Sequence, residues 1–183
     1  MAKRKKLAPV KKAIPKKYDG DDSMDSMMLK EPVAPYGVSM PAARAIAFMG
    51  SPGKKSFFPV RNESDFIDVI RQGIPKKAID NLVEKTGIPV NEMAILMRLS
   101  DRTLRRYNPQ TLLNPEQSER VVELSRLYSR GEEVFGNLDN FKEWMNSTVM
   151  ALGNIKPKTL LDTSLGIDIL MNELGRIEHG IFA

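Results

Sequence analysis

The chain has 183 residues, no cysteine, one histidine and a formal net charge of +5. The lack of cysteine excludes disulfides, thiolate metal sites and a cysteine nucleophile, and a lone histidine makes a zinc site improbable. No uncharged apolar run approaches the ~20 residues that a membrane helix needs. The start of the chain is positively charged like a secretory signal peptide, but prolines and lysines stand where such a peptide has its apolar stretch. We therefore expect a cytoplasmic protein with no membrane partner.

The positive charge is concentrated at the start of the chain. Residues 1–17 carry eight basic side chains and no acid. Residues 65–107 then carry eight basic and six acidic side chains, whereas residues 108–183 carry seven basic and eleven acidic ones. A basic module therefore precedes an acidic one.

Residues 1–62 are rich in Lys, Pro, Gly and Met and show no sustained hydrophobic period. This composition predicts a basic, mostly disordered extension. Its lysine run has two interpretations, a solubilising tail or contact with the DNA backbone, because lysine charge near phosphate raises affinity without reading sequence.

From residue 63 the hydrophobic pattern becomes helical, and residues 63–107 are predicted to form a helix-turn-helix DNA-binding domain. Two short helices come first. Ser64 is expected to cap the first helix, which Gly73 ends. Pro75 is placed at the start of the second helix, which stops at Gly87.

The helix-turn-helix motif follows these two helices. We expect one helix from about Val90 to Met97, a turn at Arg98, and a second helix that Ser100 caps. Leu104 should face inward, so that the arginines around it project outward, where a planar guanidinium fork suits guanine edges or phosphate. The predicted DNA-binding residues are Ser100, Arg102, Thr103, Arg105 and Arg106. The alternative is an ordinary helical hairpin with a solvated charged face.

Residues 108–114 are predicted to be a linker and residues 115–183 a small helical domain, which makes the chain all-α. The domain should open with a long helix from Pro115 to about Phe135 that has a broad apolar face. That face has two interpretations, a dimer surface or packing within the domain. A homodimer is expected because one helix-turn-helix covers few base pairs. The final helix should begin at about Ser164.

Catalytic patterns are missing from the sequence. It has no Gly-Lys-Ser/Thr phosphate loop and no Gly-x-Ser-x-Gly turn. Adjacent carboxylates such as Glu132 and Glu133 diverge on a helix instead of sharing a substrate. We therefore predict that the protein is not an enzyme and has no catalytic residue, metal or cofactor.

Five segments of the C-terminal region resemble the toxin-binding domain of the Xre/MbcA/ParS antitoxins. They are residues 130–136 (Arg-Gly-Glu-Glu-Val-Phe-Gly), 144–145 (Trp-Met), 151–153 (Ala-Leu-Gly), 157–163 and 174–183. Residues 65–107 also look like the Xre/Cro-like DNA-binding half of such proteins. The resemblance implies an antitoxin of a bacterial type II toxin-antitoxin pair, opposed to a RES-domain toxin that consumes NAD+. It also implies autoregulation through operator DNA.

The apolar end of the chain suggests how such a toxin is blocked. We hypothesise that the tail enters or covers the NAD+ pocket, with apolar anchors buried and an anionic group paired to the cations that otherwise hold phosphate. The predicted toxin-binding residues are Arg176, Glu178, His179, Ile181, Phe182 and Ala183. The alternative is that the tail folds back and completes the core of its own domain.

Two other classes of function remain open at this point. A stand-alone helix-turn-helix regulator would use its C-terminal domain to dimerise or to bind another partner. A basic structural DNA-binding protein would rely on the lysine run and show steep salt dependence with little sequence preference.

Overall fold

The computed structural model describes residues 40–50, 60, 62 and 64–180. Regular structure in these residues is helical, and two isolated β-bridges join Pro75 to Leu112 and Val149 to Ile155. This confirms the predicted all-α class. The elements in chain order are α1 (Met40–Phe48), α2 (Asp65–Gln72), α3 (Lys77–Thr86), α4 (Val90–Leu96), α5 (Asp101–Arg106), α6 (Pro115–Phe135), α7 (Leu138–Asn146), the 3₁₀ helices η1 (Met150–Leu152) and η2 (Pro157–Leu160), and α8 (Ser164–Glu178).

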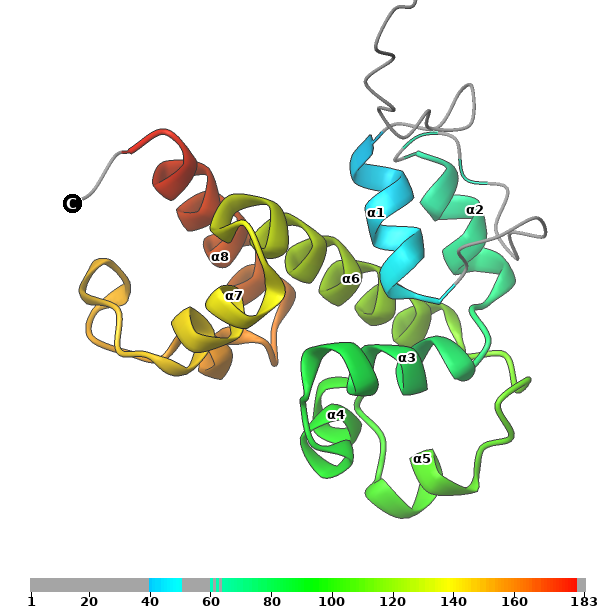
Figure 1. Ribbon diagram of the computed structural model, residues 1–183. Coiled ribbons are helices and arrows are strands. Elements are labelled where there is room, and N and C mark those ends of the chain that lie inside the picture. Colours follow the sequence, from blue (N-terminus) through cyan, green and yellow to red (C-terminus); the bar gives the residue numbers. More distant parts are fainter. Residues whose placement is uncertain (1–39, 51–59, 61, 63, 181–183) are drawn as a thin grey trace, which may run out of the picture. The chain divides into compact units, whose positions relative to one another are not determined.

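Helix α6 is the element against which most of the others pack (Figure 1). Its start is fixed by a capping box, in which the Asn114 side chain accepts a hydrogen bond from the Gln117 backbone at 2.8 Å. Gly136 ends it in the left-handed conformation, with φ of 78°. Helices α1, α2 and α3 contact α6, and so do α7 and α8. One helix therefore serves as a common support, and the predicted domain limits at residues 107 and 115 stay a prediction.

Helix α1 lies inside the region that the sequence led us to treat as a mostly disordered extension, so residues 40–48 form an ordered part of it. Ala42 and Ala45 are buried, and α1 packs on α6. Side chains of α3 bind its carbonyl end, because Asn81 Nδ2 donates to the Met49 carbonyl at 2.9 Å and Lys85 Nζ donates to that of Ala47. The helical pattern of residues 40–48 was difficult to recognise in the sequence because prolines and glycines flank this segment. Residues 1–39 lie outside the described residues.

The start of α2 also differs from expectation. Ser64 has helical backbone angles and makes no side-chain cap. Asn62 performs this role instead, since its Oδ1 accepts hydrogen bonds from the Ser64 and Asp65 backbone N–H groups at 2.9 and 3.2 Å. Both residue types favour caps, so sequence position alone did not decide between them.

The apolar face of α6 is covered by other helices of the same chain. Val121, Leu124 and Leu127 are fully buried. The ring of Phe141 in α7 meets Tyr128 of α6 edge-on, with centroids 5.2 Å apart. Of the two interpretations of this face, packing within the chain is the one observed. None of the described helices is both long and apolar enough to cross a membrane.

Candidate functional site

The turn between α4 and α5 has the geometry that the motif predicts. Arg98 adopts φ of 54°, a left-handed conformation that side-chain-bearing residues seldom adopt. Ala94, which is 1% exposed, lets the chain fold back closely, and its carbonyl accepts a hydrogen bond from the Leu99 N–H at 2.9 Å. Ser100 then caps α5, because its Oγ accepts a hydrogen bond from the Thr103 N–H at 3.0 Å. The expected turn and cap are confirmed.

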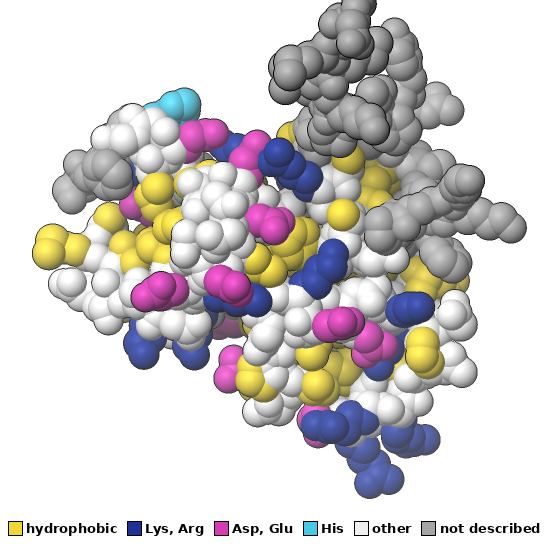
Figure 2. All heavy atoms as spheres, viewed as in Figure 1, with side chains coloured by type: hydrophobic (Ala, Val, Ile, Leu, Met, Phe, Trp, Pro, Cys, Tyr) yellow, Lys and Arg dark blue, Asp and Glu magenta, His cyan; other side chains and the backbone are white. Residues whose placement is uncertain are grey.

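Helix α5 presents a basic outer face. Leu104 points inward and is 2% exposed, as predicted, whereas Arg102, Arg105 and Arg106 are exposed. Lys and Arg side chains gather over α5, at the bottom of the view in Figure 2. Such a face is available to the edges of bases or to phosphates.

The predicted DNA-binding residues are not equivalent in this structure. Arg105 is held by Asp101, whose carboxylate accepts from Nε at 2.8 Å, and this hydrogen bond raises the pKa of the guanidinium. The Thr103 hydroxyl lies 2.7 Å from Ser100 Oγ. Arg102 and Arg106 make no ion pair with any residue that the structure describes. Arg102 and Arg106 can therefore bind a phosphate or a base without first breaking an ion pair.

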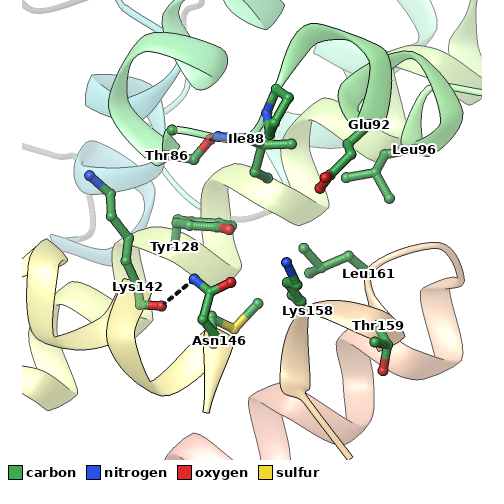
Figure 3. Close-up of a pocket in the computed structure, with 13 residues that line it drawn as sticks. Thr86, Ile88, Glu92, Leu96, Tyr128, Lys142, Asn146, Lys158, Thr159 and Leu161 are labelled. Atoms are coloured by element: carbon green, nitrogen blue, oxygen red, sulfur yellow. Dashed lines mark hydrogen bonds between the residues drawn. The ribbon is translucent and has the colours of Figure 1, made fainter.

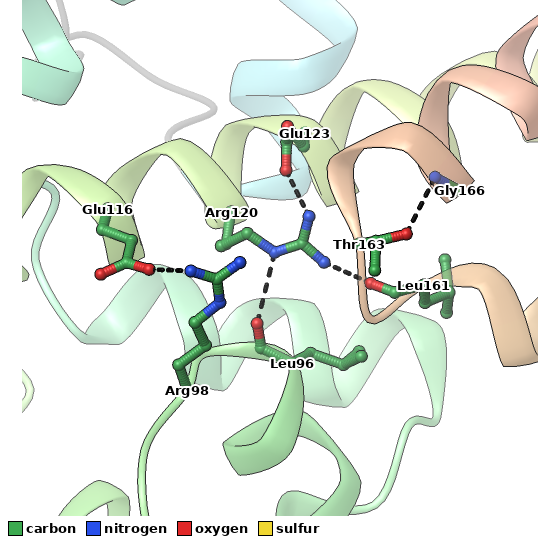
Figure 4. Close-up of polar contacts among 8 residues, drawn as sticks. All are labelled: Leu96, Arg98, Glu116, Arg120, Glu123, Leu161, Thr163 and Gly166. Carbon is green, nitrogen blue, oxygen red and sulfur yellow. Dashed lines mark hydrogen bonds and ion pairs between the residues drawn. The ribbon is translucent and has the colours of Figure 1, made fainter.

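Two arginines connect the turn to α6 (Figure 4). Arg98 pairs with Glu116 in the first turn of α6, and both side chains are more than half exposed. Arg120, by contrast, is 3% exposed. Its Nε donates to the Leu96 carbonyl at 3.3 Å, at the end of α4, and its Nη1 pairs with Glu123 at 2.5 Å.

The guanidinium of Arg120 also donates from Nη2 to the carbonyl of Leu161, just before α8 begins. One buried side chain thus binds backbone groups of both the helix-turn-helix and the C-terminal half. Arg120 is not among the functional residues predicted from the sequence. A signal was present, because Arg120 lies four and seven residues before Leu124 and Leu127, on the apolar stripe of α6. A charged residue at that position must be paired when it is buried.

The C-terminal site residues are divided between described and undescribed parts of the chain. Glu178 pairs with Arg130 of α6, and Arg176 pairs with Glu173 within α8 at 3.3 Å. His179 is exposed at the end of α8. Ile181, Phe182 and Ala183 lie outside the described residues. The role of the tail therefore stays a prediction.

The Arg130 guanidinium belongs to a network that ties three helices together. Glu133 of α6 accepts from Arg130 at 3.0 Å and from Arg44 of α1 at 2.6 Å. Burial acts to raise the pKa of the Glu133 carboxyl, but the two guanidinium groups outweigh it and the net pKa is lowered. The ion pairs of this network hold the middle of α1 and the C-terminal end of α8 against α6.

Several large apolar side chains are exposed in the C-terminal half. Met150 of η1 is 78% exposed and Leu165 of α8 is 70% exposed, and Ile155 and Ile169 are also exposed. These residues lie near the segments that carry the family resemblance. Exposed apolar side chains of this size are features of protein interaction sites when they lie close together.

No cluster of potential metal ligands occurs among the residues that the structure describes. A helix with an exposed basic face and an acidic helical region lie in the same described part of the chain. Comparison with known proteins gives the family.

Two families match adjoining parts of the chain. Residues 65–126 match the antitoxin Xre-like helix-turn-helix domain, and residues 130–180 match the antitoxin Xre/MbcA/ParS C-terminal toxin-binding domain. A protein of Yersinia enterocolitica named Antitoxin Xre is 30% identical over 128 residues, which cover 68% of this chain and 86% of that relative. The chain belongs to the Xre antitoxin family. The resemblance seen in the sequence is thereby confirmed.

Two further proteins with similar sequences are also named antitoxins. Antitoxin Xre of Photorhabdus laumondii is 25% identical over 126 residues, covering 68% of this chain and 85% of the relative. A Sphingobium protein named Prs ADP-ribosylating antitoxin is 28% identical over 130 residues, covering 65% of this chain and 81% of that protein. The helix-turn-helix match extends to residue 126, well into α6. Helix α6 therefore contributes residues to both matched regions.

Proposed function

We propose that this antitoxin binds a RES-type toxin in the cytoplasm and stops it from degrading NAD+ by occluding its active site. The protein acts by binding and needs no catalytic group or cofactor of its own. The observation that carries the proposal is the presence of exposed Met150, Leu165 and Ile169 within the region that matches a toxin-binding domain. Burying such side chains against a partner is favourable by about 25 cal/mol per Å².

The tail would supply the occluding element. Arg176, Glu178 and His179 carry the chain out of α8 toward Ile181, Phe182 and Ala183, which would enter or cover the toxin pocket. Glu178 pairs with Arg130, so it would have to exchange this partner to bind the toxin's cations. A carboxylate suits guanidinium groups that otherwise hold phosphate.

An NAD+ consumption assay with the purified toxin tests both parts. Deletion of residues 180–183 should restore NAD+ loss while the truncated protein keeps its helical circular dichroism. Leu165→Ser should weaken the complex, and Leu112→Ser is the matched control because Leu112 is 60% exposed but lies outside the toxin-binding match. Full inhibition by the truncated protein would refute occlusion by the tail. Equal effects of the two serine variants would refute the role of the α8 surface.

We further propose that the antitoxin represses its own operon by placing α5 in the major groove of operator DNA. Support comes from the helix-turn-helix match and from the exposed Arg102 and Arg106. Two copies would bind paired half-sites, and this homodimer would lie within a larger toxin-antitoxin complex. Gel-shift titration with the native promoter tests the DNA claim, and light scattering of the free protein tests the dimer. Equal affinity for promoter and scrambled DNA would contradict operator recognition.

A further inference from the structure

A cavity of about 400 Å³ lies where the helix-turn-helix meets the C-terminal half (Figure 3). Its walls come from the turn before α4, from α4 itself, from α6 and α7, and from η2. Volumes of this order are typical of small-molecule sites. The floor is apolar, with Leu96, Met145 and Leu161 nearly or fully buried.

Tyr128 projects its hydroxyl group into this cavity from α6 (Figure 3). The residue is 3% exposed, yet its hydroxyl makes no hydrogen bond with any residue that the structure describes. At the wall of the cavity, this hydroxyl can form a hydrogen bond with a molecule that enters it. Burial, followed by the charge of Glu92, raises the pKa of this phenol. It therefore remains a neutral donor throughout the physiological pH range.

Opposite charges face the same cavity from its two sides. The Glu92 carboxylate points inward from α4 and the Lys158 ammonium from η2 (Figure 3). Both side chains are exposed, and neither forms an ion pair with a described residue. A ligand that carries both a positive and a negative group could bind each of them.

Asn146 lines the cavity with an exposed side chain and adds a hydrogen-bond acceptor. Its Nδ2 donates to the Lys142 carbonyl at 2.8 Å, which leaves Oδ1 directed into the cavity (Figure 3). Glu92 and Asn146 thus offer acceptors, and Lys158 and Tyr128 offer donors. The apolar floor lies between these two pairs of groups.

We propose that this cavity binds a small zwitterionic molecule with an apolar body, the chemistry of a free hydrophobic amino acid. Its carboxylate would bind Lys158 and the Tyr128 hydroxyl, its ammonium group Glu92 and Asn146, and its side chain the apolar floor. Because the cavity walls belong to both halves, the occupied site would join them more firmly. The inference is independent of toxin binding and of operator binding.

Calorimetric titration of the full chain with L-leucine and L-phenylalanine tests the site. Binding is expected at ligand concentrations up to about 10 mM. Two single-charge analogues of leucine, 4-methylpentanoate and isopentylamine, should bind at least about tenfold more weakly than leucine, because each loses one charged contact. If neither amino acid binds, or if an analogue binds as well as leucine, the proposal is overturned.

Variants then locate the binding. Lys158→Gln and Glu92→Gln should each weaken leucine binding by about tenfold, and Tyr128→Phe, which removes only the hydroxyl, by about threefold. Lys156→Gln is the control, since Lys156 is exposed nearby but does not line the cavity. All four should retain wild-type helical signal. Unchanged leucine binding in both charge variants would refute the assignment. NMR shifts of the Asn146 side-chain amide that do not change when leucine is added would also refute it.

Discussion

Substituting Arg120 with alanine is expected to destabilise the fold by about 3–5 kcal/mol, because it breaks a buried ion pair from one side. The truncated side chain removes the donors bound to the carbonyls of Leu96 and Leu161. Each buried polar group left unpaired costs about 1–3 kcal/mol. The Glu123 side chain is 20% exposed and can recover water, so its own penalty is at the lower end of that range.

Arg98→Ala is the matched control for this prediction. Arg98 also connects the helix-turn-helix region to α6 through an ion pair, but its side chain is 62% exposed and that of Glu116 is 55% exposed. Solvent screens such a pair, and its loss should cost about 0–1 kcal/mol. The two variants therefore separate the effect of burial from that of charge.

Urea unfolding followed by circular dichroism measures both variants against the wild type. If Arg120→Ala is too unstable to purify, Arg120→Lys provides the measurement. It keeps the charge but cannot reach Leu96, Leu161 and Glu123 together, so it should still lose more stability than Arg98→Ala. Equal stability of either Arg120 variant and Arg98→Ala would show that burial of Arg120 contributes nothing beyond an exposed ion pair.

Three further predictions concern backbone, contact and packing. Arg98→Gly should be more stable than Arg98→Ala by about 1 kcal/mol in the same unfolding assay, because glycine adopts the left-handed turn without strain; equal stability would contradict this. Arg102→Ala or Arg106→Ala should weaken operator binding, and loss of a phosphate contact should reduce the salt slope by about 1, whereas unchanged binding in both would exclude α5 as the reading helix. Gly131→Ala should destabilise by about 1–3 kcal/mol through overpacking, since the added Cβ would lie 2.5 Å from a buried aromatic ring. A Cβ added at Gly175 would have nothing within 4 Å, so Gly175→Ala should stabilise the protein by about 1 kcal/mol through the higher helix propensity of alanine. Thermal melting measures both glycine variants, and a Gly131→Ala protein more stable than Gly175→Ala would refute the packing argument.

Local chemistry made much of the fold predictable. The helix limits around α5 and α6 follow from short-range signals, such as the Ser100 cap, the Asn114 capping box and the left-handed Gly136. The inward position of Leu104 follows from helical periodicity. Family membership was equally recognisable, because five short segments in a fixed order carried the resemblance. The proposed contacts with DNA and toxin stay predictions.

Features that depend on distant partners were missed or left open. Helix α1 is held by α6 and by side chains of α3, so its own sequence between prolines and glycines gave a weak signal. The apolar face of α6 had two possible uses, and only the packed chain shows that α7 and other helices cover it. Contacts of this kind join residues far apart in sequence, where local propensity carries no information.

By itself, the sequence determined the helical class, the order of the turn and its cap, and the family, because each depends on neighbouring residues or on a linear pattern. Tertiary structure decided that Arg120 is buried between two backbone carbonyls and that the Tyr128 hydroxyl opens into a cavity. The physical reason is that desolvation depends on everything surrounding a side chain. The sequence contains the same arginine or tyrosine whether the side chain is solvated or buried. Only the folded structure decides which of its polar atoms need a hydrogen-bond partner within the protein.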